Sequence, residues 1–119
     1  MQNYRSLDAW KLAHRLAIDV SRSVDRHWRP RGAACFDQLR RAAISVPANI
    51  VEGYALGTSP QFARHLRIAI GSAAEAEYLV LLCMECDHLP ETESDQFMQR
   101  ADRLLAVLHG LLKKVRARR

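Results

Sequence analysis

The amino-acid sequence predicts an all-α protein, an antiparallel up-down-up-down four-helix bundle formed by a single domain over residues 1–119. Apolar side chains recur at alternating spacings of three and four along almost the whole chain, which is the period of one helix face. Clusters of proline and glycine divide this pattern into four segments with short connections. A chain of 119 residues is long enough to bury one hydrophobic core without disulfides or metals.

The first predicted helix begins near Ser6 or Leu7 and ends at about Trp28, because Pro30 and Gly32 follow as helix breakers. One face carries its apolar side chains: Trp10, Ala13, Ala17, Val20 and Val24. Another face carries basic residues with acids interleaved at helical spacing: Lys11, Arg15, Arg22, Arg26 and Arg29, with Asp8, Asp19 and Asp25. Because such spacing favours ion pairs, we expect a solvated surface on which Asp19 and Asp25 compensate Arg22.

The second predicted helix runs from about Cys35 to Leu56, and Gly57 suits the left-handed residue that ends many helices. Its core stripe consists of Leu39, Ala43, Val46, Ile50 and Tyr54. Pro47 lies inside this helix, where it removes one backbone hydrogen bond and costs about 3 kcal/mol or more, so we predict a kink. A second apolar stripe is formed by Ile44, Ala48 and Val51. Its presence predicts burial against something beyond the three partner helices.

Polar residues also follow one line along the second helix: Arg41, Ser45, Asn49 and Glu52. Two interpretations are open. The line forms an internal hydrogen-bond network, as buried polar groups usually do, or Asn49 and Glu52 line a functional pocket. We favour the network.

The third predicted helix begins at Ser59, a hydroxyl cap, with Pro60 in its first turn. It ends before Pro90, and Thr92 opens the fourth helix with Asp95 in the capping-box position. The core positions of the third helix are Phe62, Leu66, Ala69, Ala73, Ala76, Val80 and Cys83. Those of the fourth are Phe97, Ala101, Leu104 or Leu105, Leu108 and Leu111 or Leu112.

Charge is unevenly distributed along the chain, whose formal net charge is +5. Residues 1–72 hold 11 Lys and Arg against 5 Asp and Glu, and residues 73–112 hold 2 against 8. The tail 113–119 adds five basic residues and no acid. Complementary halves favour self-association, and an uncompensated basic tail attracts nucleic acid. The candidate nucleic-acid contacts are Arg64, Arg67, Lys113, Lys114, Arg116, Arg118 and Arg119.

Catalytic, cofactor and metal sites are not expected. Cys83 and Cys86 have the spacing of a zinc or redox pair, but they fall late in a helix, where the dipole disfavours a thiolate. We interpret them as core thiols. Glu85 and His88 have the spacing of a di-iron ligand pair, yet such a site needs a second pair and two further glutamates. Phosphate-binding loops, nucleophile elbows and dinucleotide fingerprints are missing from the sequence.

A cytoplasmic location without membrane contact is the simplest expectation. No apolar run in the sequence reaches the ~20 residues that cross a bilayer. The first residues, MQNYRSLDAW, lack the apolar region of a signal peptide.

Two stretches, LRRAAISVPANIVEGY and TSPQFARHLRIAIGSAAEAEYLV, resemble the bacterial four-helix bundle proteins encoded within intervening sequences of 23S ribosomal RNA genes. The matching motif residues are Arg41, Ser45, Pro47, Asn49, Glu52, Gly53, Glu75 and Glu77. The family usually begins its third helix with Ser-Lys-Glu-Phe, whereas this chain has Ser59 to Phe62 as SPQF, a change of charge but not of cap.

The resemblance implies a ring-shaped homopentamer in which these motif residues serve the structure or the assembly. It also implies a distant likeness to the accessory protein of diversity-generating retroelements, a basic pentamer that contacts nucleic acid and a reverse transcriptase. The resulting hypothesis is a non-enzymatic accessory protein that binds RNA or DNA, with RNA preferred. The alternative is a scaffold that binds a protein, such as a reverse transcriptase, and no nucleic acid. An enzyme with a site around Asn49 and Glu52 at subunit junctions is a third hypothesis, which we favour least.

Overall fold

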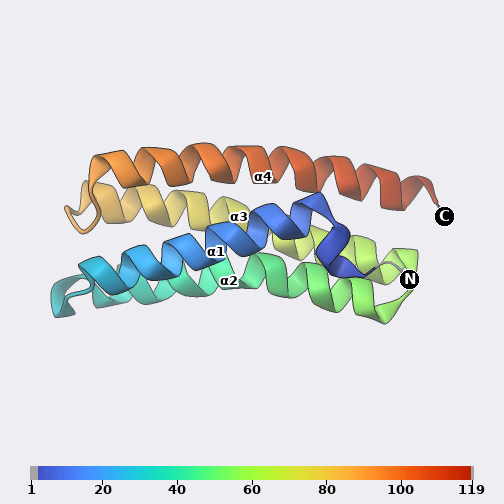
Figure 1. Cartoon of the computed structure of the whole chain (residues 1–119), viewed down its shortest axis with the longest axis horizontal. Coiled ribbons are helices and arrows are strands. Elements are labelled where there is room, and N and C mark those ends of the chain that lie inside the picture. Colours follow the sequence, from blue (N-terminus) through green and yellow to red (C-terminus); the bar gives the residue numbers. More distant parts are fainter. Residues whose placement is uncertain (1–2, 119) are drawn as a thin grey trace.

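Four long helices make up the protein (Figure 1). The computed structural model describes residues 3–118. The helices are α1 (Asp8–His27), α2 (Ala33–Leu56), α3 (Ser59–Glu85) and α4 (Glu91–Ala117), with single 3₁₀ turns η1 (Tyr4–Ser6) and η2 (Pro30–Gly32) before α1 and α2. Residues 3–118 contain no strand, so the predicted all-α class and the four segments are confirmed.

The helices lie side by side in an elongated body of 47 × 20 × 20 Å. The α1–α2 and α3–α4 connections lie at one end, and the α2–α3 connection lies at the other end, near both termini (Figure 1). Each helix packs against its neighbours in the sequence, and α1 also packs against α4. The contact between α2 and α3 is the most extensive of these.

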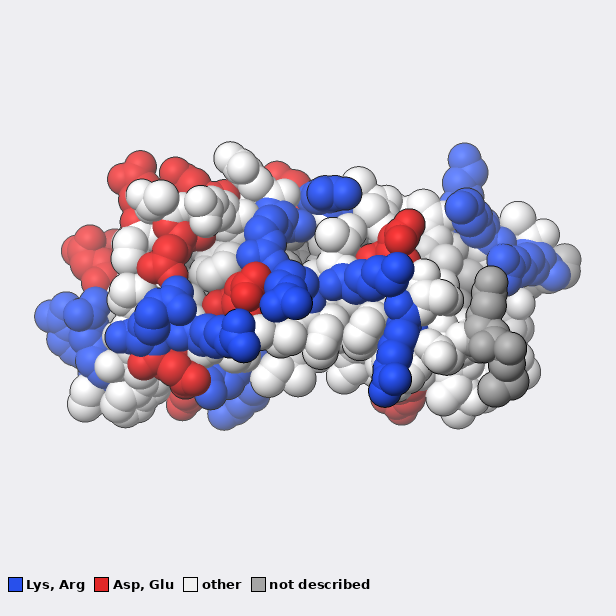
Figure 2. Space-filling view, viewed as in Figure 1, with Lys and Arg blue, Asp and Glu red and all other residues white. Residues whose placement is uncertain are grey.

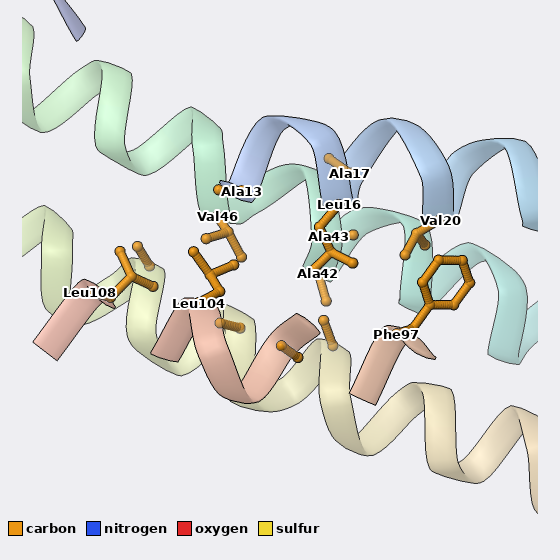
Figure 3. Packing of buried hydrophobic residues seen from close by; sticks show 14 of the residues in the cluster. Ala13, Leu16, Ala17, Val20, Ala42, Ala43, Val46, Phe97, Leu104 and Leu108 are labelled. Atoms are coloured by element: carbon orange, nitrogen blue, oxygen red, sulfur yellow. The ribbon is translucent and has the colours of Figure 1, made fainter. Parts of the chain in front are cut away.

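Small and large side chains alternate across the core. Figure 3 shows alanines of α1 and α2, among them Ala13 and Ala43, on the side that faces α4. From α4, Phe97, Leu104 and Leu108 point toward them (Figure 3). All five side chains are buried. Alanine allows the backbones to approach, and Leu and Phe fill the remaining space between the helices.

Gly53 of α2 lies close to His65 of α3. A Cβ atom at position 53 would lie 2.6 Å from the His65 Cβ and 3.1 Å from the Phe62 ring. Contacts at 2.6 Å are essentially absent from real structures, and here the neighbouring atom sits next to the backbone of α3. Glycine is therefore required at position 53 for packing, whereas its φ angle is ordinary for a helix.

The beginning of α3 differs from the prediction by one residue. Thr58, not Ser59, is the N-cap, and its Oγ1 accepts a hydrogen bond from the Gln61 amide at 3.4 Å. Ser59 and Pro60 are the first two helical residues, where an amide has no helical partner, so the missing N–H of Pro60 costs little. Gly57 has φ 81°, which confirms the left-handed residue after α2.

The beginning of α4 was also predicted incorrectly. The helix starts at Glu91 with Pro90 as the N-cap residue, and no side chain forms a capping hydrogen bond there. Thr92 is thus inside the first turn, and the expected capping box with Asp95 does not form. Ser94 instead donates from Oγ to the Pro90 carbonyl at 2.8 Å. Pro90 fixes its own φ near −63°, so the chain enters the helix without a hydroxyl cap.

Pro47 is buried inside α2, and the helix continues through it from Ala33 to Leu56. The kink stays a prediction. The second apolar stripe of α2 lies largely outside the core: Ile44 is 47% exposed, Ala48 is exposed and Val51 is half-buried. This stripe is therefore an apolar surface that the three other helices do not cover.

The role of Gly53 can be tested by comparing two glycine-to-alanine substitutions. Gly53→Ala should lower the unfolding free energy by about 1–3 kcal/mol, because the new methyl group forces α2 and α3 apart. Gly71→Ala, in α3, should raise it by about 0.5–1 kcal/mol, since a Cβ there meets no atom within 4 Å and alanine favours a helix. Urea unfolding of both variants measures the difference, and two shifts of the same sign would contradict the packing argument.

Candidate nucleic-acid interface

The basic tail continues α4 as a helix. The helix extends to Ala117, and Val115 is buried, so this segment is attached to the bundle. Four of the candidate contacts are exposed there: Lys113, Lys114, Arg116 and Arg118. Arg119 lies outside the described residues. Basic side chains gather at the right-hand end in Figure 2, where α4 ends.

The first turns of α3 lie beside the last turn of α4. Thr58, Ser59 and Phe62 share a hollow of about 320 Å³ with Val115 and Arg118. Arg64 and Arg67 follow within the next two turns of α3, and both are exposed. Neither forms an ion pair within residues 3–118. The start of α3 thus lies at the same end of the molecule as the basic tail. Arg64 and Arg67 follow it along α3.

The acids of α1 pair with other helices, which corrects the expectation for Arg22. Asp19 binds Arg100 of α4 at 3.0 Å, and Asp25 binds Arg40 of α2 at 2.5 Å. Arg22 is exposed and has neither acid as an ion-pair partner in the described chain. Arg40 is thereby attached to α1 through Asp25.

A further basic surface consequently lies along α1. Lys11, Arg15 and Arg22 are exposed, and none of them forms an ion pair with a described residue. Figure 2 shows Lys and Arg side chains following α1 across this face, with few acids between them. Residue spacing did not predict this surface, because it paired Asp19 and Asp25 with Arg22 on the same helix.

At the opposite end of the molecule, Glu93 of α4 joins two helices. Its carboxylate accepts hydrogen bonds from Ser23 at 2.9 Å and Arg26 at 2.5 Å, and it contacts His27 Nε2 at 2.7 Å. Partial burial raises the pKa of Glu93, but the hydrogen bonds from His27, Arg26 and Ser23 outweigh it and lower the pKa below its ordinary value. This cluster attaches the last turn of α1 to the first turn of α4.

The polar line on α2 divides into an internal part and an exposed part. Asn49 Nδ2 donates to the Ser45 carbonyl at 2.9 Å, and Asn49 Oδ1 lies 3.0 Å from His65 Nδ1. Because the amide NH₂ of Asn49 is directed at Ser45, its oxygen is the acceptor and His65 Nδ1 carries the proton. Ser45 Oγ also contacts Ser72 Oγ at 2.9 Å.

These contacts form a network between α2 and α3 in which the polar groups satisfy one another. Glu52 and Arg41 are exposed and take no part in it. The sequence predicted a network on this line but did not identify His65 and Ser72 as partners.

The paired glutamates of α3 have different environments. Glu75 is exposed and accepts a hydrogen bond from Gln38 of α2 at 3.0 Å. Glu77 is half-buried against Asp102 of α4. A hydrogen bond shared with Asp102, desolvation and repulsion between the two carboxylates raise the pKa of Glu77 to about 7. The pKa of Glu77 therefore lies well above the ordinary value of a glutamate.

The cysteines lie where α2 begins and α3 ends. Cys83 is buried, Cys35 is half-buried and Cys86 is exposed at the end of α3. Desolvation, with smaller contributions from Cys35 and Cys86, raises the pKa of the Cys83 thiol to about 12, so it remains a neutral core group. His88 is buried beside Phe36, and its Nδ1 has no partner among the described residues. Within residues 3–118, no three His, Cys, Asp or Glu side chains are arranged to hold a metal ion.

Comparison with known proteins gives the family. Residues 5–110 match the family model described as 23S rRNA-intervening sequence protein. The chain belongs to this family. The matched region ends before the basic tail, so the tail is a feature of this chain beyond what the family match covers.

A solved structure shares the fold. It is a protein of unknown function from the S23 ribosomal protein family of Bacteroides thetaiotaomicron, 17% identical, with a TM-score of 0.77. The alignment covers 88% of this chain and 95% of that one. A search of curated proteins found no match. No helix among the described residues is long and apolar enough to cross a membrane.

The raised pKa of Glu77 beside Asp102 predicts a pH-dependent stability. An unfolded glutamate releases its proton near pH 4.5, whereas folded Glu77 keeps it until about pH 7. Between these values the unfolding free energy therefore falls as pH rises. Asp102→Asn removes the repulsion, so this variant should melt higher than the original chain at pH 8 but not at pH 4.5.

Circular dichroism at the two pH values measures this difference. Glu75→Gln is the matched control on the same helix, because it removes one negative charge and keeps an oxygen that can accept the hydrogen bond from Gln38. It should not raise the melting temperature at pH 8. An equal effect of Asp102→Asn at both pH values would show that Asp102 does not raise the pKa of Glu77.

Proposed function

We propose that the chain is a cytoplasmic, non-enzymatic accessory protein that binds RNA through phosphate contacts, without base specificity. The observation that carries this proposal is the basic end of the bundle. Lys113, Lys114, Arg116 and Arg118 are exposed on the last turns of α4, and no ion pair within the described chain neutralises them. Uncompensated Lys and Arg on one surface attract a polyanion.

Self-association is the second part of the proposal. The chain forms an antiparallel up-down-up-down bundle with a kinked α2, and five copies assemble into a ring. The support is the uncovered apolar stripe of Ile44, Ala48 and Val51, together with the acidic start and basic end of α4. Assembly multiplies the basic end by the number of subunits and so increases avidity for RNA.

A protein-interaction scaffold is the alternative function. Its support is the set of large apolar side chains that the bundle leaves exposed: Trp28, Ile44, Leu56, Ile68 and Tyr78. On this alternative a partner protein, for example a reverse transcriptase, covers part of this surface and the basic residues serve only solubility and assembly.

A salt titration of RNA binding tests the phosphate contacts. The logarithm of the affinity should fall linearly with the logarithm of salt, by about 0.7 per phosphate contact on a single strand. The tail variant changes Lys113, Lys114, Arg116 and Arg118 to Gln. Substitution is preferable to deletion, because deletion would also remove the buried Val115. We expect a clearly shallower slope, and a smaller reduction when Arg64 and Arg67 are changed to Gln.

Two single substitutions provide the matched comparison. Arg22→Gln and Arg100→Gln change the net charge equally, but Arg100 is paired with Asp19 and Arg22 is unpaired within residues 3–118. Arg22→Gln should therefore reduce the slope more. Fluorescence anisotropy measures affinity, and light scattering measures the mass of the binding species. Absence of binding at low salt would reject the RNA proposal and leave the scaffold, and a monomeric mass would reject the ring.

A further inference from the structure

A hollow between α3 and α4 combines apolar side chains with two carboxylates. Its volume is about 420 Å³, and it is lined by Ala74, Glu77, Tyr78, Leu81, Met98 and Asp102. Tyr78 is 57% exposed, which makes it the most exposed large apolar side chain in residues 3–118. Because tyrosine is enriched at the centres of protein–protein contacts, an exposed ring beside apolar side chains indicates an interaction surface.

The two carboxylates of this α3–α4 hollow have no cation beside them in the described chain. Neither Glu77 nor Asp102 forms an ion pair with a Lys or Arg side chain of residues 3–118. They face one another, and the hydrogen bond to Asp102, burial and repulsion raise the pKa of Glu77. A guanidinium placed between them would favour the ionised form of both, because an opposite charge stabilises a carboxylate. The hollow is therefore complementary to an arginine that is accompanied by an apolar side chain.

The exposed side of α2 carries this combination of side chains. Arg41 is exposed, and its guanidinium forms no ion pair with a described residue. Ile44, one turn further along α2, is 47% exposed, and Ala48 follows it and is also exposed. Since residues three and four apart on a helix are neighbours, Arg41, Ile44 and Ala48 form one continuous surface, which we call the α2 surface.

The α2 surface and the α3–α4 hollow lie on opposite sides of the bundle. α2 packs against α1 and α3, and α4 packs against the same two helices, so α2 and α4 lie diagonally across the bundle. Ile44 lines a depression on the α1–α2 side together with Ile18, whereas the hollow opens between α3 and α4. The α2 surface can therefore reach the hollow of another copy but not its own. Such a contact joins two different surfaces of identical chains and continues from copy to copy until the assembly closes.

We propose that the α3–α4 hollow binds the α2 surface of a second copy, with Arg41 between Glu77 and Asp102 and with Ile44 against Tyr78. This inference rests on the proposed self-association and names the two surfaces that meet. Arginine binds carboxylates through charge-assisted hydrogen bonds, and complementary charges determine which surfaces of two molecules meet. None of the basic residues proposed to bind RNA belongs to either surface. Because Arg41 supplies the missing cation in the assembly, the pH-dependent melting of Asp102→Asn is measured on dilute protein, in which the copies are separate.

A charge swap tests this contact by light scattering over a dilution series, on protein treated with nuclease to remove nucleic acid. Arg41→Glu places a third carboxylate at the hollow and should weaken association by about tenfold or more. Asp102→Arg should weaken it similarly, because two guanidinium groups then face one another. The double variant restores the pair with its charges exchanged and should recover most of the original association. Both side chains are exposed in a single copy, and circular dichroism confirms that each variant folds.

Matched controls carry the same changes outside the two surfaces. Arg103→Glu and Asp95→Arg alter exposed residues of α4 that do not line the hollow, and neither should change the association. Tyr78→Ser removes the exposed ring and should weaken association by roughly tenfold, as expected for an aromatic at the centre of a contact. Trp28→Ser removes a ring that is 47% exposed but belongs to neither surface, so it should leave the association unchanged.

The possible failures have different outcomes. An assembly that Arg41→Glu and Asp102→Arg leave unchanged would overturn this contact and retain self-association through another surface. Two weakened single variants whose double variant does not recover would show that the two residues do not meet, which also overturns the contact. A monomeric mass of the unaltered chain at every concentration would overturn self-association itself and this contact with it. The measurement contains no RNA, so none of these outcomes depends on whether the chain binds RNA.

Discussion

The close approach of α2 and α3 is the constraint on which the rest of the structure depends. Gly53 allows the two backbones to meet at His65, and the side chain of His65 then reaches Asn49. Asn49 in turn binds Ser45, whose hydroxyl contacts Ser72. Since each polar group in this series has a partner, burial between the helices carries little cost. Hydrogen bonding thereby explains Ser45 and Asn49 of this motif, and packing explains Gly53.

The charged ends of the molecule follow from this arrangement. The short turn at Gly57 and Thr58 places the first turn of α3 beside the last turn of α4, where Arg118 joins the hollow. At the other end, Glu93 attaches α4 to α1 through Ser23, Arg26 and His27. Acidic and basic residues are therefore separated along the length of α4. The proposed RNA-binding surface comprises the basic end of α4 and the exposed side of α1.

The sequence predicted the fold class, the four helices and most of the core, because apolar periodicity depends only on local spacing. It also predicted the left-handed Gly57 and a polar network at Asn49. The prediction from the sequence was wrong for ion pairs that join distant segments of the chain. Asp19 and Asp25 bind Arg100 and Arg40 instead of Arg22, since an acid pairs with whichever helix packs against it.

The residues at which α3 and α4 start were also difficult to predict from the sequence. Thr58 and Ser59 are both good caps, and the sequence does not say which hydroxyl reaches an amide. α4 begins at Glu91, after Pro90, without a capping side chain. A prediction based on capping residues therefore placed its start too late, at Thr92. His65 was unassigned because its buried partner lies on another helix, 16 residues earlier in the sequence. The hollow at Phe62 could not be predicted for a similar reason, as Arg118 comes from the far end of the chain.

The central claim is that the Asn49 network holds the bundle together while the basic end binds RNA. A double-mutant cycle of Asn49→Ala and His65→Leu, with unfolding free energy and RNA affinity measured on each folded variant, tests it most directly. The account predicts a coupling energy of about 1 kcal/mol in stability and an unchanged RNA affinity. A coupling energy near zero, together with a loss of RNA affinity in Asn49→Ala, would contradict it and place the binding site at the network.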